Sequence, residues 1–306
     1  MIFNLKKTDI KFTNFYSKLN IVSILLIILS IIAITFKGLN LGVDFKGGTL
    51  IELRTDNSQI NISDIRQSFL RMDLGDVSVQ KFGSENDYLV KIEQTETQDN
   101  NFIKKINQKI SNDLGSEINF RRVENVGPKV SRELIKSAII AITLSMTAML
   151  IYIWFRFEWQ FSLASIIALI HDVLITIGIF SILSYEINLS IIAALLTIVG
   201  YSLNDTVVIF DRIRENLRKY SKITIQEISN ISTNETLART IITSFTTLLA
   251  LFSIFFFGGE ILKGFSFAMI IGVIIGTYSS IFVATPILNY SKVNQKSVMK
   301  TDEKNN

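Results

Sequence analysis

The sequence of 306 residues contains no cysteine, one histidine and two prolines. Without cysteine the chain has no disulfide, thiolate zinc site, iron–sulfur cluster or cysteine nucleophile, and a single histidine excludes a histidine-rich metal site. Charged residues make up 19% of the chain, whereas apolar residues make up 48% and the mean hydropathy is +0.38. That hydropathy is high for a water-soluble domain, so the composition argues against a soluble globular enzyme.

Long uncharged stretches account for this hydropathy. A bilayer core of about 30 Å is crossed by a helix of roughly 20 apolar residues. Four uncharged stretches approach or exceed that length, at 19–36, 137–155, 240–259 and 264–291, and two more, at 159–185 and 187–210, are interrupted by few polar residues. The sequence therefore predicts six transmembrane helices, over 19–37, 134–155, 160–184, 187–210, 238–258 and 264–290.

Lysine and arginine indicate how these helices are oriented. They gather in the N-terminal segment 1–18, in the loop 211–232 and in the tail 291–306, while the opposite short loops are nearly without them. Because cytoplasmic loops carry an excess of Lys and Arg, both termini are predicted to be cytoplasmic and 38–132 to lie outside the cytoplasm. Contact with anionic membrane lipid then explains the basic pI of about 9.1, and no nucleic-acid partner is expected.

The segment 38–132 has a different pattern from the rest of the chain. Short alternating stretches at 48–53, 77–83, 87–94 and 118–126 read as strands, and amphipathic stretches at 62–72 and 102–114 read as helices. The order βαββαβ is that of the ferredoxin-like fold, in which two helices cover one face of a four-stranded antiparallel sheet. The predicted fold class is thus an α-helical polytopic membrane protein with one extracytoplasmic α+β ferredoxin-like domain between its first two helices.

Two carboxylates, Asp172 and Asp205, lie inside predicted membrane helices. Such groups are costly in a bilayer and are by default candidates for an ion or proton pathway. Asn204, beside Asp205, is a candidate to hold water with it, and Arg239, at the start of the fifth helix, is a candidate partner for Asp205. Alternatives stay open: Asp172 can serve a hydrogen bond between helices, His171 can be a neutral hydrogen-bonded histidine, and Arg239 can reach the headgroups.

Packing and interfacial charge explain other small and polar residues of the predicted helices. Gly272 and Gly276 form a Gly-x-x-x-Gly pattern that predicts close helix packing. Asp211, Arg212 and Arg214 follow Asp205 by one or two turns, where solvated interfacial charge is the expected reading.

Several stretches resemble a known family. They are LNLGVDFKGGTLIEL at 39–53, VGPKVSREL at 126–134, ALIHDVLITIG at 168–178, IVGYSLNDTVVIFDRIREN at 198–216, and the helices at 235–259 and 264–287. In these the sequence is similar to the SecD/SecF family of bacterial protein-export membrane proteins, in the RND superfamily, and to its SecF members. The resemblance covers nearly the whole chain except the polar tail after Ser291.

The resemblance implies a function and partners. SecF-like proteins pair with SecD, six helices each, and use the proton-motive force to promote late translocation and release of unfolded exported polypeptides through SecYEG at the bacterial inner membrane. YajC and YidC are further candidate partners. Asp205 then matches the carboxylate of the family's proton path and Arg239 its arginine partner, with Asn204 beside them and Asp172 and His171 as further candidates. Neither a cofactor, a bound metal nor enzymatic catalysis is expected.

The same resemblance gives the glycine-rich segment after the first helix a structural role. Gly42, Asp44, Gly47 and Gly48 are expected to form a tight junction between that helix and the first strand. Two other functions remain open, a passive assembly subunit that stabilises SecD or the channel, and an RND-type exporter of small molecules or lipids. The coupling ion is expected to be H⁺, with Na⁺ as the alternative.

Overall fold

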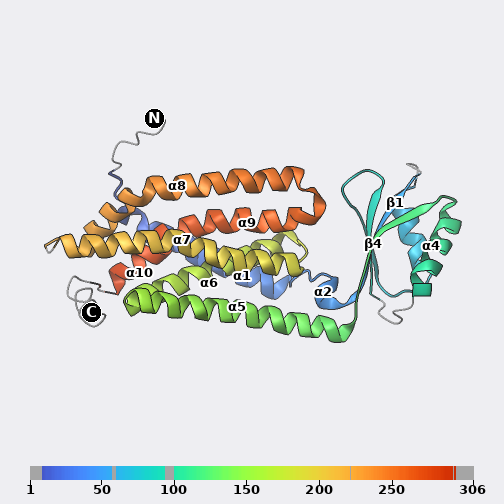
Figure 1. The fold of residues 1–306 in the computed structure, drawn as a ribbon, viewed down its shortest axis with the longest axis horizontal. Coiled ribbons are helices and arrows are strands. Elements are labelled where there is room, and N and C mark those ends of the chain that lie inside the picture. The colour runs from blue at the N-terminus through green and yellow to red at the C-terminus, as the bar shows by residue number, and fades with distance from the viewer. Residues whose placement is uncertain (1–8, 57–59, 94–99, 221, 292, 294–306) are drawn as a thin grey trace. The chain divides into compact units, whose positions relative to one another are not determined.

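A computed structural model describes residues 9–56, 60–93, 100–220, 222–291 and 293 (Figure 1). The tail 291–306 and the N-terminal segment 1–18, for which cytoplasmic positions are predicted, therefore fall largely or partly outside the described residues. The chain divides into two compact units. One comprises 1–39, 140–185 and 190–306, and the other comprises 40–139 together with 186–189. We call them the helical unit and the sheet unit.

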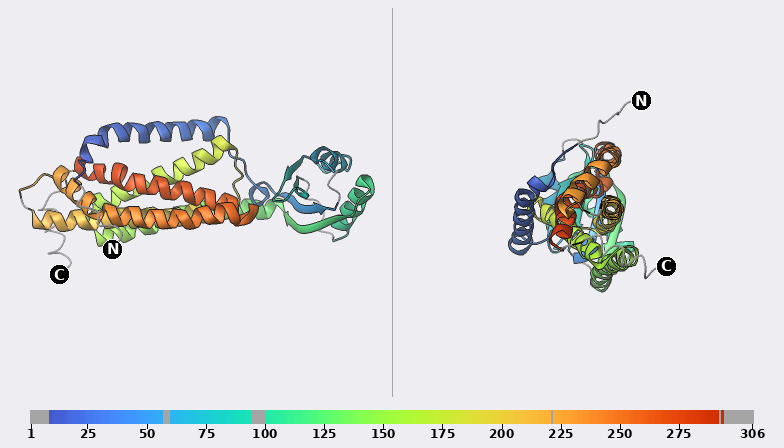
Figure 2. Two further views of the ribbon diagram at one scale, coloured as in Figure 1. Left: turned by 90° about the horizontal axis from the view of Figure 1, so that it is seen from above. Right: turned by 90° about the vertical axis from the view of Figure 1, so that its left-hand side faces the viewer.

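Long apolar helices make up the helical unit. Among the described residues six helices are long and apolar enough to cross a membrane, which confirms the predicted number. They are α1 (Thr13–Phe36), α5 (Pro128–Arg156), α6 (Trp159–Leu183), α7 (Leu189–Lys219), α8 (Ile225–Phe257) and a last span at Ile261–Tyr290, which consists of α9 (Gly259–Ser279), a π-helical turn η1 (Ser280–Ala284) and α10 (Thr285–Tyr290). Helix α6 lies beside α1 and α9, and α8 lies beside α9 (Figure 2).

Helices α7 and α8 are longer than the sequence predicted. The region 211–232, expected as a loop, is helical up to Lys219 and again from Ile225. A capping box begins α8, because the Thr224 side chain accepts from the Glu227 amide at 3.3 Å and the Glu227 carboxylate accepts from the Thr224 amide at 3.3 Å. Side-chain bonds then join the two helices, with Arg212 Nε at 2.6 Å from Glu235 Oε2.

Arg214 differs from its expected state. Solvated charge was predicted for Arg214, but its exposed fraction is 6% and its Nε lies 3.5 Å from Oε1 of Glu158, which is also 6% exposed. A guanidinium buried in an apolar bundle needs a carboxylate or carbonyl partner, and a second donor, Nη1, lies 3.3 Å from the Arg156 carbonyl oxygen. The interpretation of Arg214 as a solvated charge was therefore wrong. The Asp211 side chain is 58% exposed but forms an ion pair with Arg156 at 3.0 Å.

The sheet unit has the predicted ferredoxin-like topology. Its elements are α2 (Val43–Lys46), β1 (Gly48–Thr55), α3 (Ile62–Leu70), β2 (Val77–Lys81), β3 (Asp87–Ile92), α4 (Asn100–Leu114) and β4 (Ile118–Val126). The sheet order is β2-β3-β1-β4, with every neighbouring pair antiparallel. One face packs against α3 and α4 through a core that includes Ile51, Phe69, Val90 and Ile110. The short helix α2 was not predicted.

Candidate functional site

Asp172 and His171 lie at the centre of the helical unit. The exposed fractions of Asp172 and His171 are 0% and 1%. One carboxylate oxygen of Asp172 lies 2.8 Å from Nδ1 of His171, and the other accepts hydrogen bonds from Ser202 on α7 at 2.6 Å and from Ser279 on α9 at 2.8 Å. Asp172 thus joins three helices through one carboxylate. We call these four residues the Asp172 cluster.

Aromatic and hydroxyl groups extend the Asp172 cluster towards α1. The ring of Tyr278 stacks on that of His171 with centroids 6.2 Å apart. The Tyr278 hydroxyl lies 2.9 Å from Oγ of Ser23 and donates to the Leu19 carbonyl oxygen at 2.7 Å. Among the described side chains, Nε2 of His171 is a buried polar atom without a hydrogen-bond partner. Such an atom is costly in a membrane bundle unless water or a proton-exchanging group reaches it.

Asp205 lies one helical turn from Ser202 on α7. Its exposed fraction is 4%, and it accepts a long hydrogen bond, 3.4 Å, from Ser244 on α8. Ser244 also lies 2.7 Å from Thr277 on α9. Since Ser202 and Asp205 are three residues apart, about 4.5 Å along the helix axis, the two carboxylates lie in one polar core between α6, α7, α8 and α9.

The polar core ends at an irregular turn of helix. Immediately after Ser279 the last span becomes π-helical over Ser280–Ala284, and the Thr285 hydroxyl bonds back to the Ser280 carbonyl oxygen at 2.8 Å. Pro286, which lacks an amide hydrogen, follows within the first turn of α10. Single π turns of this kind are frequent at functional sites because they leave backbone carbonyls without a regular partner.

Asn204 and Arg239 do not join this core. Both residues are exposed on the surface of the helical unit, and Arg239 forms no ion pair with any described residue. The predicted Asp205–Arg239 pair is therefore not formed in this conformation. Asn204 and Asp205 are consecutive on α7, so they point about 100° apart around the helix, which leaves Asp205 inside and Asn204 outside.

Glycines bring α9 close to α7 beside the core. A Cβ atom at Gly272 would lie 2.3 Å from the Ile198 side chain, and one at Gly276 would lie 2.9 Å from Cβ of Ser202. Any larger residue at Gly276 would push Ser202 away from Asp172. The small residues thus set the spacing on which the Asp172 cluster depends.

The glycine-rich segment forms a tight turn within the sheet unit. Gly47 and Gly48 have φ angles of 82° and 122°, which L-residues rarely adopt, and a Cβ atom at Gly48 would lie 2.5 Å from the Ile92 carbonyl oxygen. The Asp44 carboxylate accepts from the Leu189 amide at 2.9 Å. The Gly42 amide donates to the Ile187 carbonyl oxygen at 2.9 Å.

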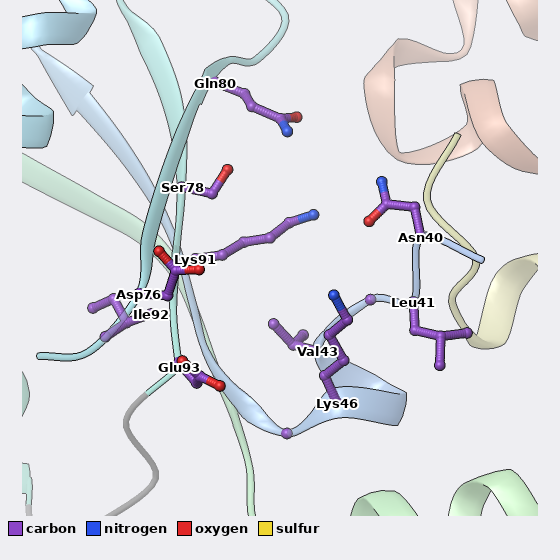
Figure 3. Close-up of a pocket in the computed structure, with 12 residues that line it drawn as sticks. Asn40, Leu41, Val43, Lys46, Asp76, Ser78, Gln80, Lys91, Ile92 and Glu93 are labelled. Atoms are coloured by element: carbon purple, nitrogen blue, oxygen red, sulfur yellow. The ribbon is translucent and has the colours of Figure 1, made fainter. Parts of the chain in front are cut away.

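A cavity of about 220 Å³ lies between this turn and strands β2 and β3 (Figure 3). Lys91 extends into it from β3, and Ser78 and Gln80 line it from β2 (Figure 3). Burial, and then the positive charge of Lys46, lowers the pKa of Lys91 to about 8. The Glu186 carboxylate is the ion-pair partner of Lys91.

The family models decide the identity of the chain. The model described as "Protein export membrane protein SecD/SecF, C-terminal" matches residues 106–294, and "SecD/SecF GG Motif" matches residues 32–59. The chain belongs to the SecD/SecF family. The resemblance that the sequence motifs indicated is thereby confirmed.

Its relatives in this family are named as SecF subunits. A protein translocase subunit SecF of Rickettsia bellii is 46% identical over 284 residues, covering 92% of this chain and 93% of that protein. One of Cereibacter sphaeroides is 44% identical over 282 residues, covering 89% and 86%. Both SecF proteins match the chain almost end to end.

Two solved SecDF structures have the same fold. The crystal structure of SecDF from Thermus thermophilus, a translocon-associated membrane protein, superposes with a TM-score of 0.85 at 32% identity over 95% of this chain. A SecDF crystal structure in a super-membrane-facing form gives a TM-score of 0.66 at 30% identity over 97%. The chain spans 40% of the length of each of these SecDF chains.

Several residues of the site were missed by sequence reasoning. Ser244, Thr277, Tyr278 and Ser279 complete the polar core, but none was singled out. Their signal was present as hydroxyl side chains within uncharged helices, yet such hydroxyls usually bond to their own helix backbone. Only the packing of α8 and α9 against α7 shows which of them face a carboxylate.

Proposed function

We propose that this chain is the SecF subunit of a bacterial protein translocase and that, with SecD, it uses the proton-motive force to promote late translocation and release of exported polypeptides through SecYEG. The observation that carries the proposal is the pair of buried carboxylates, Asp172 and Asp205, in one polar core of an otherwise apolar bundle. Neither group has a lysine or arginine ion-pair partner among the described residues. Such carboxylates can take up and release protons without covalent catalysis.

The bundle leaves room for a SecD-like partner. In the most apolar windows of α1, α5 and α8 only 11%, 11% and 17% of the residues are buried within the chain. Polar side chains are also exposed on the bundle, including Asn204 on α7 and Arg239 on α8. A polar side chain at membrane depth is stabilised by facing a protein partner instead of lipid, so a second bundle is the occupant that this surface favours.

The proposed orientation places both termini in the cytoplasm and the sheet unit on the outer side of the inner membrane. Arg212, Arg218 and Lys219 at the end of α7 support it, because positive charge gathers on the cytoplasmic side. YajC, YidC and membrane lipid remain candidate partners, and no cofactor enters the proposal.

The proposed cycle centres on Asp205 and Arg239. Protonation of Asp205 from the outer side removes its attraction for Arg239, and loss of the proton to the cytoplasm restores it. Arg239 is exposed and forms no ion pair with any residue that the structure describes, which agrees with the protonated half of this cycle. One charge that crosses 100 mV supplies about 2.3 kcal/mol, enough to bias a helix movement.

The test replaces Asp205 in cells depleted of the native protein. We expect Asp205→Asn to abolish export of a secreted reporter while the variant still co-purifies with its SecD-like partner. The matched control is Asp211→Asn, on the same helix but 58% exposed, which should export normally. Full export by Asp205→Asn would refute energy coupling at this site and favour a passive assembly subunit.

Proteoliposomes distinguish the coupling ion and the alternative function. A pH gradient without a Na⁺ gradient should support export with the purified complex, whereas dependence on a Na⁺ gradient alone would replace H⁺ by Na⁺. Gradient-driven loss of a fluorescent small molecule or lipid, without a requirement for SecYEG, would instead support an RND-type exporter.

A further inference from the structure

Residues 186–189, which immediately precede and begin α7, belong to the sheet unit. Two backbone hydrogen bonds hold this segment to the turn after α1. The Gly42 amide donates to the Ile187 carbonyl oxygen at 2.9 Å and the Ile187 amide donates to the Asn40 carbonyl oxygen at 2.8 Å, so that Leu41 and Ile187 form an isolated parallel bridge. The Ile187 side chain is 5% exposed, so the pairing is packed as well as hydrogen-bonded.

An ion pair links the same segment to the sheet. Nζ of Lys91, on β3, pairs with the Glu186 carboxylate, and the two side chains are 18% and 25% exposed. The Glu186 carboxylate fits here because residue 42 is glycine, since a Cβ atom at Gly42 would lie 2.5 Å from Oε1 of Glu186. A partly buried ammonium that loses its carboxylate is left desolvated, so this pair opposes separation of the segment from β3.

Asp44 connects the turn to α7 itself. Its Oδ2 accepts from the amide of Leu189, the first residue of α7, at 2.9 Å. Helix amides of the first turn have no partner within their helix, and a carboxylate is favoured there by the helix dipole. Asp44 therefore caps α7 from a different part of the chain, in the role that an N-cap residue ordinarily fills.

We propose that Asp44, Lys91 and Glu186 form a clasp that holds the start of α7 to the sheet unit as one rigid piece, so that a displacement of α7 during the proton cycle moves the sheet. The proposal rests on the proposed function, because it needs α7 to move when Asp205 changes its protonation. Asp205 lies 16 residues after Leu189 on one continuous helix, about 24 Å along its axis. The proposal assigns the three residues a positioning role, because they act through α7 and the sheet.

Charge-neutralising variants test the clasp. Lys91→Met and Glu186→Gln remove one partner each, and the matched controls are Lys109→Met on α4 and Glu117→Gln, both exposed. Hydrogen–deuterium exchange on the complex in proteoliposomes reports the clasp directly through the Gly42, Ile187 and Leu189 amides. We expect their exchange to become about 5- to 30-fold faster in the two variants, as for the loss of one charged hydrogen bond, and to be unchanged in the controls.

The decisive readout is the response to an imposed pH gradient. In the wild-type complex, exchange should change with the gradient both around Asp205 and in strands β2 and β3. In Lys91→Met and Glu186→Gln the change around Asp205 should persist while that in the strands is lost, together with export. A merely structural role would alter exchange without the gradient but leave the gradient response of the strands intact, and that result would overturn the proposal.

A reversible crosslink tests whether the clasp stays closed during export or has to open. The chain has no cysteine, so Leu41→Cys with Ile187→Cys introduces one defined thiol pair at the parallel bridge. The oxidised variant should export as well as its reduced form and should restore export to Lys91→Met. Export blocked by oxidation and recovered with reductant would mean that the clasp must open, which also overturns the proposal.

The Asp205→Asn variant distinguishes a failure of the clasp proposal from a failure of the proposed function. If Asp205→Asn abolishes export and the clasp variants export fully, the clasp proposal fails and the proposed function stands. If Asp205→Asn exports fully, the proposed function fails first. In the expected case the oxidised crosslink restores export to Lys91→Met but not to Asp205→Asn.

Discussion

Replacement of Asp172 is the sharpest test of the polar core. The Asp172 carboxylate contacts His171 and accepts from Ser202 and Ser279, all within 2.8 Å. Asp172→Leu keeps the branching and the number of side-chain heavy atoms but removes every acceptor. Ser279 retains an alternative, since its hydroxyl also lies 3.1 Å from the Gly276 carbonyl oxygen. The side chains of Ser202 and His171 each lose the one hydrogen-bond partner described for them.

The expected loss of stability in Asp172→Leu follows from Ser202 and His171, the two buried polar groups that lose their hydrogen-bond partner. A buried polar group left without its partner costs about 1–3 kcal/mol. Two of them predict that Asp172→Leu loses about 2–6 kcal/mol of unfolding free energy. Asp172→Asn, which keeps one carbonyl acceptor, should lose about 1 kcal/mol, in the range of single hydrogen bonds in membrane bundles.

Unfolding in mixed micelles with increasing SDS measures these differences on the purified chain. Asp211→Leu, which loses an exposed ion pair with Arg156, is the control and should change stability by less than about 1 kcal/mol. Adding Ser202→Ala to Asp172→Leu should recover part of the loss, because the stranded hydroxyl is removed with its partner. Equal stability of Asp172→Leu and the wild type would refute the hydrogen-bonded core.

Two further predictions concern other parts of the chain. Hydrogen bonding to Arg54, together with Ser84 and Arg121, lowers the pKa of Asp87 to about 2; since the unfolded pKa is about 3.9, the stability that this carboxylate adds is present above about pH 4 and is lost as the pH falls towards 2. Asp87→Asn should therefore speed hydrogen exchange of the β1 and β3 amides near pH 7. The effect should be equivalent to about 1–2 kcal/mol, because Arg54 is 37% exposed and screened by water. If the stability of the wild type depends on pH between about 4 and 2 in the same way as that of Asp87→Asn, this reasoning is wrong. Gly276→Leu should destabilise the bundle by about 1–3 kcal/mol in the same SDS assay by overpacking α9 against Ser202, whereas Gly200→Leu, with open space around its Cβ position, should not; equal effects of the two would show that the contact with Ser202 is unimportant.

The fold could be read from the sequence because two signals were strong. Uncharged apolar stretches long enough to cross a bilayer are typical of membrane helices, and the alternation of Ile51, Leu53, Val77, Val79 and Val90 marks the face of the sheet that packs against helices. The end of α7 and the start of α8 were misjudged because these turns are polar and are held by contacts between the two helices, such as Arg212 with Glu235. Charge at an interface looks the same in a sequence whether it is solvated or paired.

The sequence by itself determined the six membrane helices, the order of strands and helices in the sheet unit, and the family. It also singled out Asp172 and Asp205, because a carboxylate is costly inside a bilayer. Only the tertiary structure decided which neighbours these carboxylates have. Ser279 reaches Asp172 and Ser244 reaches Asp205 across helix interfaces, while Arg239 and Asn204 lie on the surface. The clasp of Asp44, Lys91 and Glu186 was equally hidden, because its members are up to 142 residues apart (186 − 44) and meet only through the pairing of Leu41 with Ile187. Side chains that meet across helices and strands are set by packing between distant segments, and the local patterns of a single sequence do not contain that information.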